Sequence, residues 1–61
     1  MTRREYESQF RANVLPYVRA AYEPDGRVDV IARREEWITH IDGLVRDGEL
    51  PARAINWTCP W

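Results

Sequence analysis

Residues 29–48, DVIARREEWITHIDGLVRDG, decide the fold. Asp29 belongs to the residue types that cap helix starts, because its carboxylate accepts a hydrogen bond from an unpaired backbone amide. Asp47-Gly48 ends the segment, and Gly48 suits the left-handed conformation that follows many helices. Between them, apolar side chains recur at helical spacing and form a wide stripe at Ile31, Trp37, Ile38, Ile41, Leu44 and Val45. The stretch therefore predicts a long amphipathic helix.

Two further features of this helix carry expectations. Gly43 costs about 1 kcal/mol relative to Ala inside a helix, so we expect it to mark the close approach of a neighbouring backbone. The charged run Arg33-Arg34-Glu35-Glu36 is expected to form a solvated helix face.

The segment before residue 29 predicts another helical stretch. Thr2-Arg3-Arg4-Glu5 is a capping box, in which the Thr and Glu side chains each accept a bond from an unpaired amide. Apolar residues follow at helical spacing at Tyr6, Phe10, Val14, Tyr17 or Val18, and Ala21. Pro16 donates no hydrogen bond, and its ring clashes with the carbonyl four residues back. We expect a helix over about residues 3–22 that either kinks near residues 12–16 or breaks there into two short helices. A turn at Glu23-Pro24-Asp25-Gly26 follows.

A short third helix is expected after Leu50-Pro51, because proline is favoured in the first turn of a helix. Leu50, Ala54, Trp57 and Trp61 fall on one face of it. Paired with the long helix, it makes an αα-hairpin that buries Trp37 and Trp57. The expected fold is all-α: one domain over residues 1–61, a small three-helix bundle whose first helix is kinked or broken near Pro16. Its predicted core contains Phe10, Val14, Trp37, Ile41, Leu44 and Trp57.

The composition limits the classes of function. Nine basic residues, all Arg, and ten acidic residues give a net charge of −1, which argues against a strongly basic nucleic-acid binder. Cys59 is the single cysteine, so it has no partner for an internal disulfide and indicates a reducing compartment. No run approaches the roughly 18 apolar residues of a membrane span. We expect a soluble cytoplasmic protein that does not enter membranes.

The chemistry-bearing residues do not form a recognisable catalytic or metal-binding motif. Glu36 and His40 lie four residues apart and can meet on a helix, but a metal site needs a third ligand, and Cys59 lies on another segment. An enzyme that uses these three residues is therefore the least favoured hypothesis. We expect no catalytic residue, no metal and no cofactor.

The predicted hairpin also admits a helix-turn-helix interpretation. Its second helix would be the recognition helix, and that helix offers only Arg53, Asn56 and Thr58 to a nucleic acid. A minimal helix-turn-helix DNA-binding regulator is therefore kept as the alternative function.

Binding of another protein fits the composition better. Three Trp, three Tyr and one Phe are more aromatic residues than a core of this size need hide, and exposed Trp, Tyr and Arg are enriched at binding hot spots. We expect Tyr6, Tyr17 and Tyr22 at the core or its rim with their hydroxyls in water. The predicted partner-binding residues are Trp61, Arg53, Asn56, Tyr22 and Arg33. The partner is another protein, or a second copy in a homodimer, which is a common remedy for scaffolds of this size.

The segment from Asp29 to Trp57 resembles a pattern found in small uncharacterised accessory proteins of tailed bacteriophages. That pattern joins a helix that starts at an Asp and carries Ala-Arg-Arg-Glu-x-Trp to Asp-x-Leu-x-x-Asp-Gly, an Ile or Leu, and a Trp. Here the corresponding residues are Asp29, Ala32 to Trp37, Asp42 to Gly48, Leu50 and Trp57. The pattern often has a polar residue where this chain has Ile38, and Asp or Ser in place of Pro51.

The resemblance implies a phage origin and the cytoplasm of an infected bacterium. With the composition, it leads to our main prediction: a small non-enzymatic phage accessory protein that acts by protein–protein binding, as an inhibitor or modulator of a host or phage protein.

Overall fold

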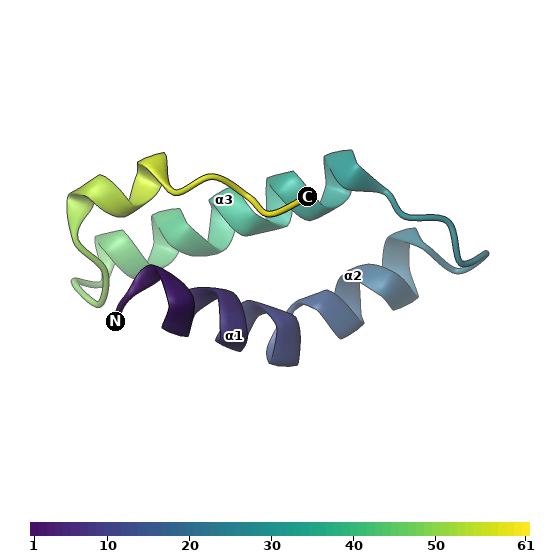
Figure 1. The fold of residues 1–61 in the computed structure, drawn as a ribbon, viewed down its shortest axis with the longest axis horizontal. Coiled ribbons are helices and arrows are strands. Elements are labelled where there is room, and N and C mark those ends of the chain that lie inside the picture. Colours follow the sequence, from purple (N-terminus) through teal and green to yellow (C-terminus); the bar gives the residue numbers. More distant parts are fainter.

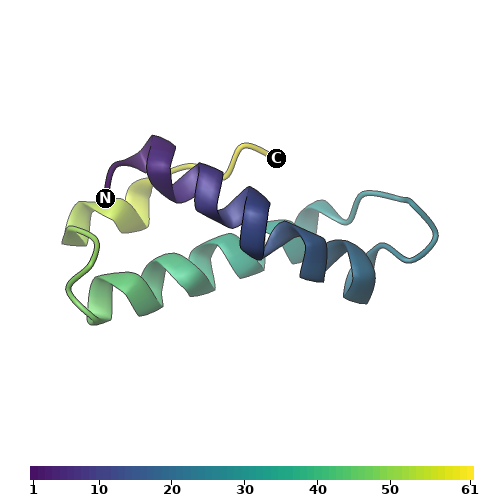
Figure 2. The same cartoon turned by 90° about the horizontal axis from the view of Figure 1, so that it is seen from below.

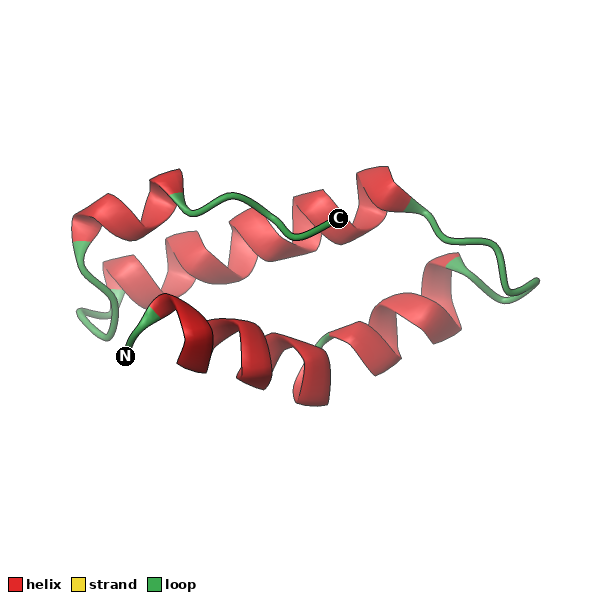
Figure 3. Ribbon diagram, in the orientation of Figure 1, coloured by secondary structure: helices red, strands yellow, loops and turns green.

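The computed structural model describes all 61 residues and contains helices and no strands. Three α-helices, α1 (Arg3–Asn13), α2 (Leu15–Tyr22) and α3 (Val30–Arg46), precede a short 3₁₀ helix, η1 (Ala52–Asn56). In Figure 1, α1 and α2 follow each other along one side of the molecule, and α3 returns along them. η1 and the last residues then fold back over α3. The prediction of an all-α fold built as a small helical bundle is confirmed (Figure 3).

Both of the predicted helix starts are capped by side chains. The Thr2 hydroxyl accepts from the Glu5 amide at 3.2 Å, and a Glu5 carboxylate oxygen accepts from the Thr2 amide at 2.9 Å. These bonds satisfy two amides that lack partners within α1. At α3, the Asp29 carboxylate accepts from the Ala32 amide at 3.0 Å. The capping expectations for both helices are confirmed.

The first helical stretch breaks rather than kinks. α1 ends at Asn13, Val14 has φ −103° and ψ −42°, and α2 begins at Leu15 with Pro16 in its first turn. Pro16 has no amide to donate, so the hydrogen-bond ladder cannot pass through it, but it fits the start of a new helix. The break lets Phe10 on α1 and Leu15 on α2 both face the core.

Two glycines end the helical segments as their turn chemistry predicts. Gly26 has φ 84° in the turn after α2, and its amide donates to the Glu23 carbonyl at 3.0 Å. Gly48 has φ 81° after α3, and its amide donates to the Val45 carbonyl at 3.1 Å. L-residues rarely adopt such φ values, so both positions favour glycine.

The sequence predictions for α3 need two corrections. A Cβ added at Gly43 would meet nothing within 4 Å, so no neighbouring backbone approaches it closely. Ile31 and Ile38 are exposed and do not belong to a buried stripe. Since an α-helix turns about 100° per residue, Ile38 lies about 100° and Ile31 about 120° away from Trp37 around the helix. Elements packed on Trp37 therefore leave both isoleucines uncovered.

The expected third α-helix is a 3₁₀ helix of five residues, η1. Leu50 and Ala54 are buried against α3, so the hairpin partly keeps its predicted packing. Trp57 lies just beyond η1 in extended backbone, with φ −68° and ψ 118°. The C-terminal segment 57–61 is therefore an extended strap, which passes beside α1 in Figure 2.

The core lies where α1, α2, α3 and η1 meet. Its buried members are Tyr6, Phe10, Leu15, Val18, Ala32, Trp37, Ile41, Leu50 and Ala54. The predicted core residues Val14, Leu44 and Trp57 are half-buried and pack against this cluster, together with Val45, Cys59 and Trp61. Aromatic rings dominate it: Tyr6 and Phe10 contact the edge of Trp37, with ring centroids 4.7 and 5.3 Å apart.

Candidate functional site

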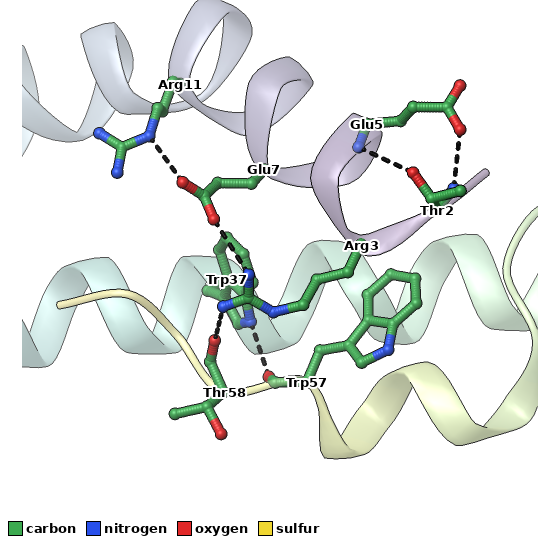
Figure 4. A network of polar contacts seen from close by, with 8 residues as sticks. All are labelled: Thr2, Arg3, Glu5, Glu7, Arg11, Trp37, Trp57 and Thr58. Atoms are coloured by element: carbon green, nitrogen blue, oxygen red, sulfur yellow. Dashed lines mark hydrogen bonds and ion pairs between the residues drawn. The ribbon is translucent and has the colours of Figure 1, made fainter.

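The strap of residues 57–61 is held by side chains of α1 and α3. The indole nitrogen of Trp37 donates to the Trp57 carbonyl at 3.0 Å, and Arg3 donates to the Thr58 carbonyl at 2.8 Å (Figure 4). An extended segment has no internal hydrogen bonds, so its carbonyls depend on such donors. The Trp57 ring packs beside Tyr6, with ring centroids 6.3 Å apart. The strap is therefore part of the folded domain.

Trp61 is packed into the molecule rather than extended into solvent. The guanidinium groups of Arg11 and Arg33 lie 4.8 and 5.2 Å from the centre of its ring, at cation–π distance. Phe10 contacts the ring with centroids 5.6 Å apart, and Arg34 donates to the Trp61 carbonyl at 2.9 Å. Trp61, one of the predicted partner-binding residues, is therefore half-buried, because arginines and aromatic rings cover part of its ring.

The sequence predicted that Arg33 lies on a solvated face of the helix and binds a partner, but the structure shows its side chain buried. Its exposed fraction is 5%, and that of Glu23 is 7%. Two hydrogen bonds, at 2.7 and 2.8 Å, join the guanidinium to the Glu23 carboxylate. The Asp29 amide also donates to Glu23, at 2.9 Å. Such a bidentate pair satisfies both charges where water is excluded, so Arg33 is a structural residue.

This ion pair shifts the pKa of both partners toward the charged forms. Hydrogen bonds from Arg33 and then from the Asp29 amide lower the pKa of Glu23 below its usual value of 4.5. The hydrogen bond to Glu23 raises the pKa of Arg33. Both groups are therefore charged at neutral pH, and the pair fastens the end of α2 to the start of α3.

Tyr6 departs from the expectation that its hydroxyl faces water. The hydroxyl donates to the Trp37 carbonyl at 2.8 Å inside the core. Burial raises the pKa of Tyr6, because the phenolate would lose its hydration there. Tyr17 and Tyr22 do not lie at the core or its rim, where the sequence predicted them, but are 56% and 45% exposed, with their rings 6.3 Å apart.

The exposed apolar surface follows α3 and continues onto η1. Ile31, Ile38 and Ile55 are 71%, 62% and 61% exposed, and together they are called here the isoleucine face. Ile38 and Ile55 line two hollows. One, of about 370 Å³, also includes Thr39, Ile41 and Asp42, and the other, of about 300 Å³, also includes Arg34, Trp37, Asn56, Trp57, Thr58 and Cys59. The isoleucine face is thus a hollowed apolar surface.

Charges of both signs border the isoleucine face. Arg34 lies beside it at the strap, and Glu35 is exposed one position further along α3. Asp42 lines the larger hollow and pairs with Arg46 at 2.8 Å. These four side chains sum to zero charge, so the face presents no single-sign field.

The remaining predicted partner-binding residues are exposed but scattered. Asn56 lines a hollow of the isoleucine face together with Ile38 and Ile55. Tyr22 is 45% exposed and lines a separate hollow of about 440 Å³ with Ile31 and the loop before α3. Arg53 is exposed on η1 and makes no ion pair. The structure therefore places Asn56 beside Ile38 and Ile55, and Tyr22 beside Ile31, at opposite ends of the isoleucine face.

The sequence pattern placed Ile31 and Ile38 in the apolar stripe of the long helix and did not single out Ile55. The helical angle contains the missing signal, because a stripe that includes both Ile31 and Trp37 spans about 120° on its own. The elements that pack on α3 cover the Trp37 side of this arc and leave Ile31 and Ile38 exposed.

The candidates for catalysis and metal binding do not assemble. His40 and Glu36 pair at 3.3 Å on the surface of α3, as their spacing predicts. Cys59 is half-buried in the strap and makes no hydrogen bond. No three His, Cys, Asp or Glu side chains come close enough to share a metal ion.

The arginines of α1 line a polar hollow, and the carboxylate of Glu7 in the same hollow neutralises part of their positive charge. Arg3, Arg4 and Arg11 line it with Glu7 and Ser8, and its volume is about 310 Å³. Glu7 accepts from Arg3 at 3.2 Å and from Arg11 at 3.1 Å (Figure 4). Arg3 and Arg11 also hold the strap, so their charges serve the fold.

The expected recognition helix is the 3₁₀ helix η1, and α3 therefore lacks the second α-helix of a helix-turn-helix motif.

None of the helices combines the length and the apolar character needed to cross a membrane. No model of a protein family, no curated protein and no solved structure matches the chain.

Proposed function

We propose that the chain is a small non-enzymatic accessory protein that works by binding a protein through the isoleucine face. The observation that carries the proposal is that Ile31, Ile38 and Ile55 are all more than 60% exposed, and that Ile38 and Ile55 together line two hollows. Ile31 lies two turns before Ile38 on the same side of α3. Fully burying one such side chain is worth about 1.5–3 kcal/mol. Three of them supply the apolar centre that a protein interface needs.

The setting is part of the same proposal. The residue pattern from Asp29 to Trp57 supports a tailed-phage origin, with the bacterial cytoplasm as the place of action. There, binding inhibits or modulates a host or phage protein. The separation of Cys59 from the surface pair of Glu36 and His40 supports a role in binding over one in catalysis.

Site-specific photo-crosslinking in bacterial cells tests the proposal. A benzophenone amino acid at position 38 should give one discrete protein adduct, and excess untagged chain should compete it away. The matched control carries the same probe at Ala20, an exposed residue of α2, and should give no adduct. Equal labelling from both positions, or none from position 38, would refute binding through this face.

A further inference from the structure

We propose that the occupant of the isoleucine face is a second copy of this chain, bound with its α3 parallel to α3 of the first about a two-fold axis. The inference rests on the proposed function, because it names the partner of the same surface. The argument uses the angular positions of the charges that flank the isoleucines.

Ile31 and Ile38 form the centre line of this contact. They are seven residues apart on α3, so at about 100° per residue they lie nearly above one another. Arg34 then lies about 50° to one side of that line, and Glu35 about 50° to the other. Both are exposed. The isoleucine face is therefore bordered by a positive charge on one flank and a negative charge on the other.

A parallel two-fold pairing matches these flanks. Rotation about an axis along the helices places each flank opposite the other flank of the second copy, so Arg34 meets Glu35 of the second copy, and the contact occurs twice. Residues on an isologous interface pair reciprocally in this manner. Ile31 and Ile38 would meet their own equivalents between the two charge pairs, which gives an apolar centre with a polar rim.

The antiparallel pairing is disfavoured by the same charges. It places each flank opposite itself, so when Ile31 meets Ile38 of the second copy, Arg34 lies opposite Arg34 and Glu35 opposite Glu35. Like charges would then face each other on both flanks, which is destabilising. Charge therefore selects the parallel arrangement.

The remaining properties of the face also fit a second copy. Its four bordering charges, Arg34, Glu35, Asp42 and Arg46, sum to zero, so neither phosphate nor a strongly charged protein gains much from them. A stable interface takes about 800 Å² from each partner. An area of about 800 Å² is less than a fifth of the 4317 Å² surface of the chain. The molecule measures 36 × 18 × 17 Å, so one of its long sides has an area of about this size.

Charge reversal with mixing tests the inference on the full chain. Analytical ultracentrifugation should show a monomer–dimer equilibrium for the wild type. Arg34→Glu alone and Glu35→Arg alone should each weaken it by at least about tenfold. An equimolar mixture of the two variants should form a heterodimer, because each copy then supplies the charge that the other lacks. The double variant R34E/E35R should dimerise like the wild type.

Arg4→Glu is the control, since Arg4 is exposed on α1 away from α3. It should leave the dimer unchanged, and circular dichroism should show every variant folded. A monomeric wild type, or single reversals and mixtures that dimerise equally, would overturn the inference. If the wild type is monomeric yet crosslinks another protein at position 38, the proposed function stands without the second copy. If it is monomeric and crosslinks nothing, both fail.

Discussion

Tyr6 shows at the scale of one residue how polar atoms are accommodated in so small a core. Its ring contacts Trp37, Phe10 and Trp57, while its hydroxyl donates to the Trp37 carbonyl. The sequence predicted the ring's burial from its helical position. The hydroxyl's partner could not be predicted, because it belongs to a residue 31 positions away whose distance depends on the packing of α1 on α3.

Tyr6→Phe should destabilise the fold by about 1 kcal/mol, which is the usual net contribution of one buried hydrogen bond. The ring packing stays, so the protein should remain folded. Urea unfolding followed by tryptophan fluorescence measures the change. Tyr17→Phe, at an exposed position, is the matched control and should have almost no effect. Equal effects of the two changes would contradict a role for the Tyr6 hydroxyl.

Trp61 gives a second prediction at this scale. Trp61→Ala should cost about 2–3 kcal/mol, somewhat less than the range for a fully buried tryptophan, because the ring is only half-buried. Trp61→Phe keeps a ring for Arg11 and Arg33 to cover and should lose less. Thermal unfolding monitored by circular dichroism compares the two. An unchanged midpoint for Trp61→Ala would mean that the strap is not held in solution.

At the scale of the elements, the sequence predicted the helices well where local chemistry decides them. Thr2, Asp29 and Pro16 act within a few residues of themselves, so the sequence predicted the starts of α1 and α3 and an interruption near Pro16, which it left open as a kink or a break. The sequence did not predict the conformation of the strap and η1. The strap carbonyls depend on donors from Arg3 and Trp37, which lie on other elements. The same holds for Arg33, whose partner Glu23 follows another helix.

One glycine lies within α3 and another follows its end, and substitution of each by alanine should change the stability of the fold in opposite directions. Gly43→Ala should stabilise the fold by about 0.5–1 kcal/mol, since alanine is the better helix former and nothing lies within 4 Å of the added Cβ. Gly48→Ala should destabilise it by about 1 kcal/mol, because φ is 81° there. Chemical denaturation of both variants decides the matter. A loss of stability at Gly43 would indicate a contact that this structure does not contain.

The pair of Glu23 and Arg33 makes the junction of α2 with α3 sensitive to acid. Because the pKa of Glu23 is lowered from 4.5 in the folded state, the unfolded chain binds the proton first as the pH falls. The stabilising effect is therefore complete above about pH 4.5 and disappears as the pH drops through the lower pKa of the folded protein.

We expect the urea midpoint of the wild type to fall more steeply between about pH 5 and pH 3 than that of Glu23→Gln, which has no carboxylate there to titrate. Glu49→Gln, at an exposed position, should follow the wild type. Parallel curves for the wild type and Glu23→Gln would show that this pair does not control the acid response.

For the whole molecule, the fold class followed from hydrophobic period and turn chemistry, but the surface did not. Only 11 of 61 residues are buried. Small differences in the angular position of an apolar side chain around its helix therefore decide whether it lies in the core or at the surface. A pattern of apolar residues does not say how many neighbours will cover it. Ile31 and Ile38 therefore share the apolar stripe of α3 with Trp37 in the sequence, but the positions of α1, η1 and the strap around α3 leave them exposed.

The position of Arg33 ties distant parts of the chain into one cooperative unit. Its guanidinium pairs with Glu23, which lies at the start of the loop between α2 and α3, and it also covers the ring of Trp61. Loss of that single side chain would loosen the loop and the C-terminus at once, although 38 positions separate Glu23 from Trp61. In amide hydrogen exchange, the Asp29 amide, which donates to Glu23, and the Trp57 amide, which donates to Ala54, would then both lose protection.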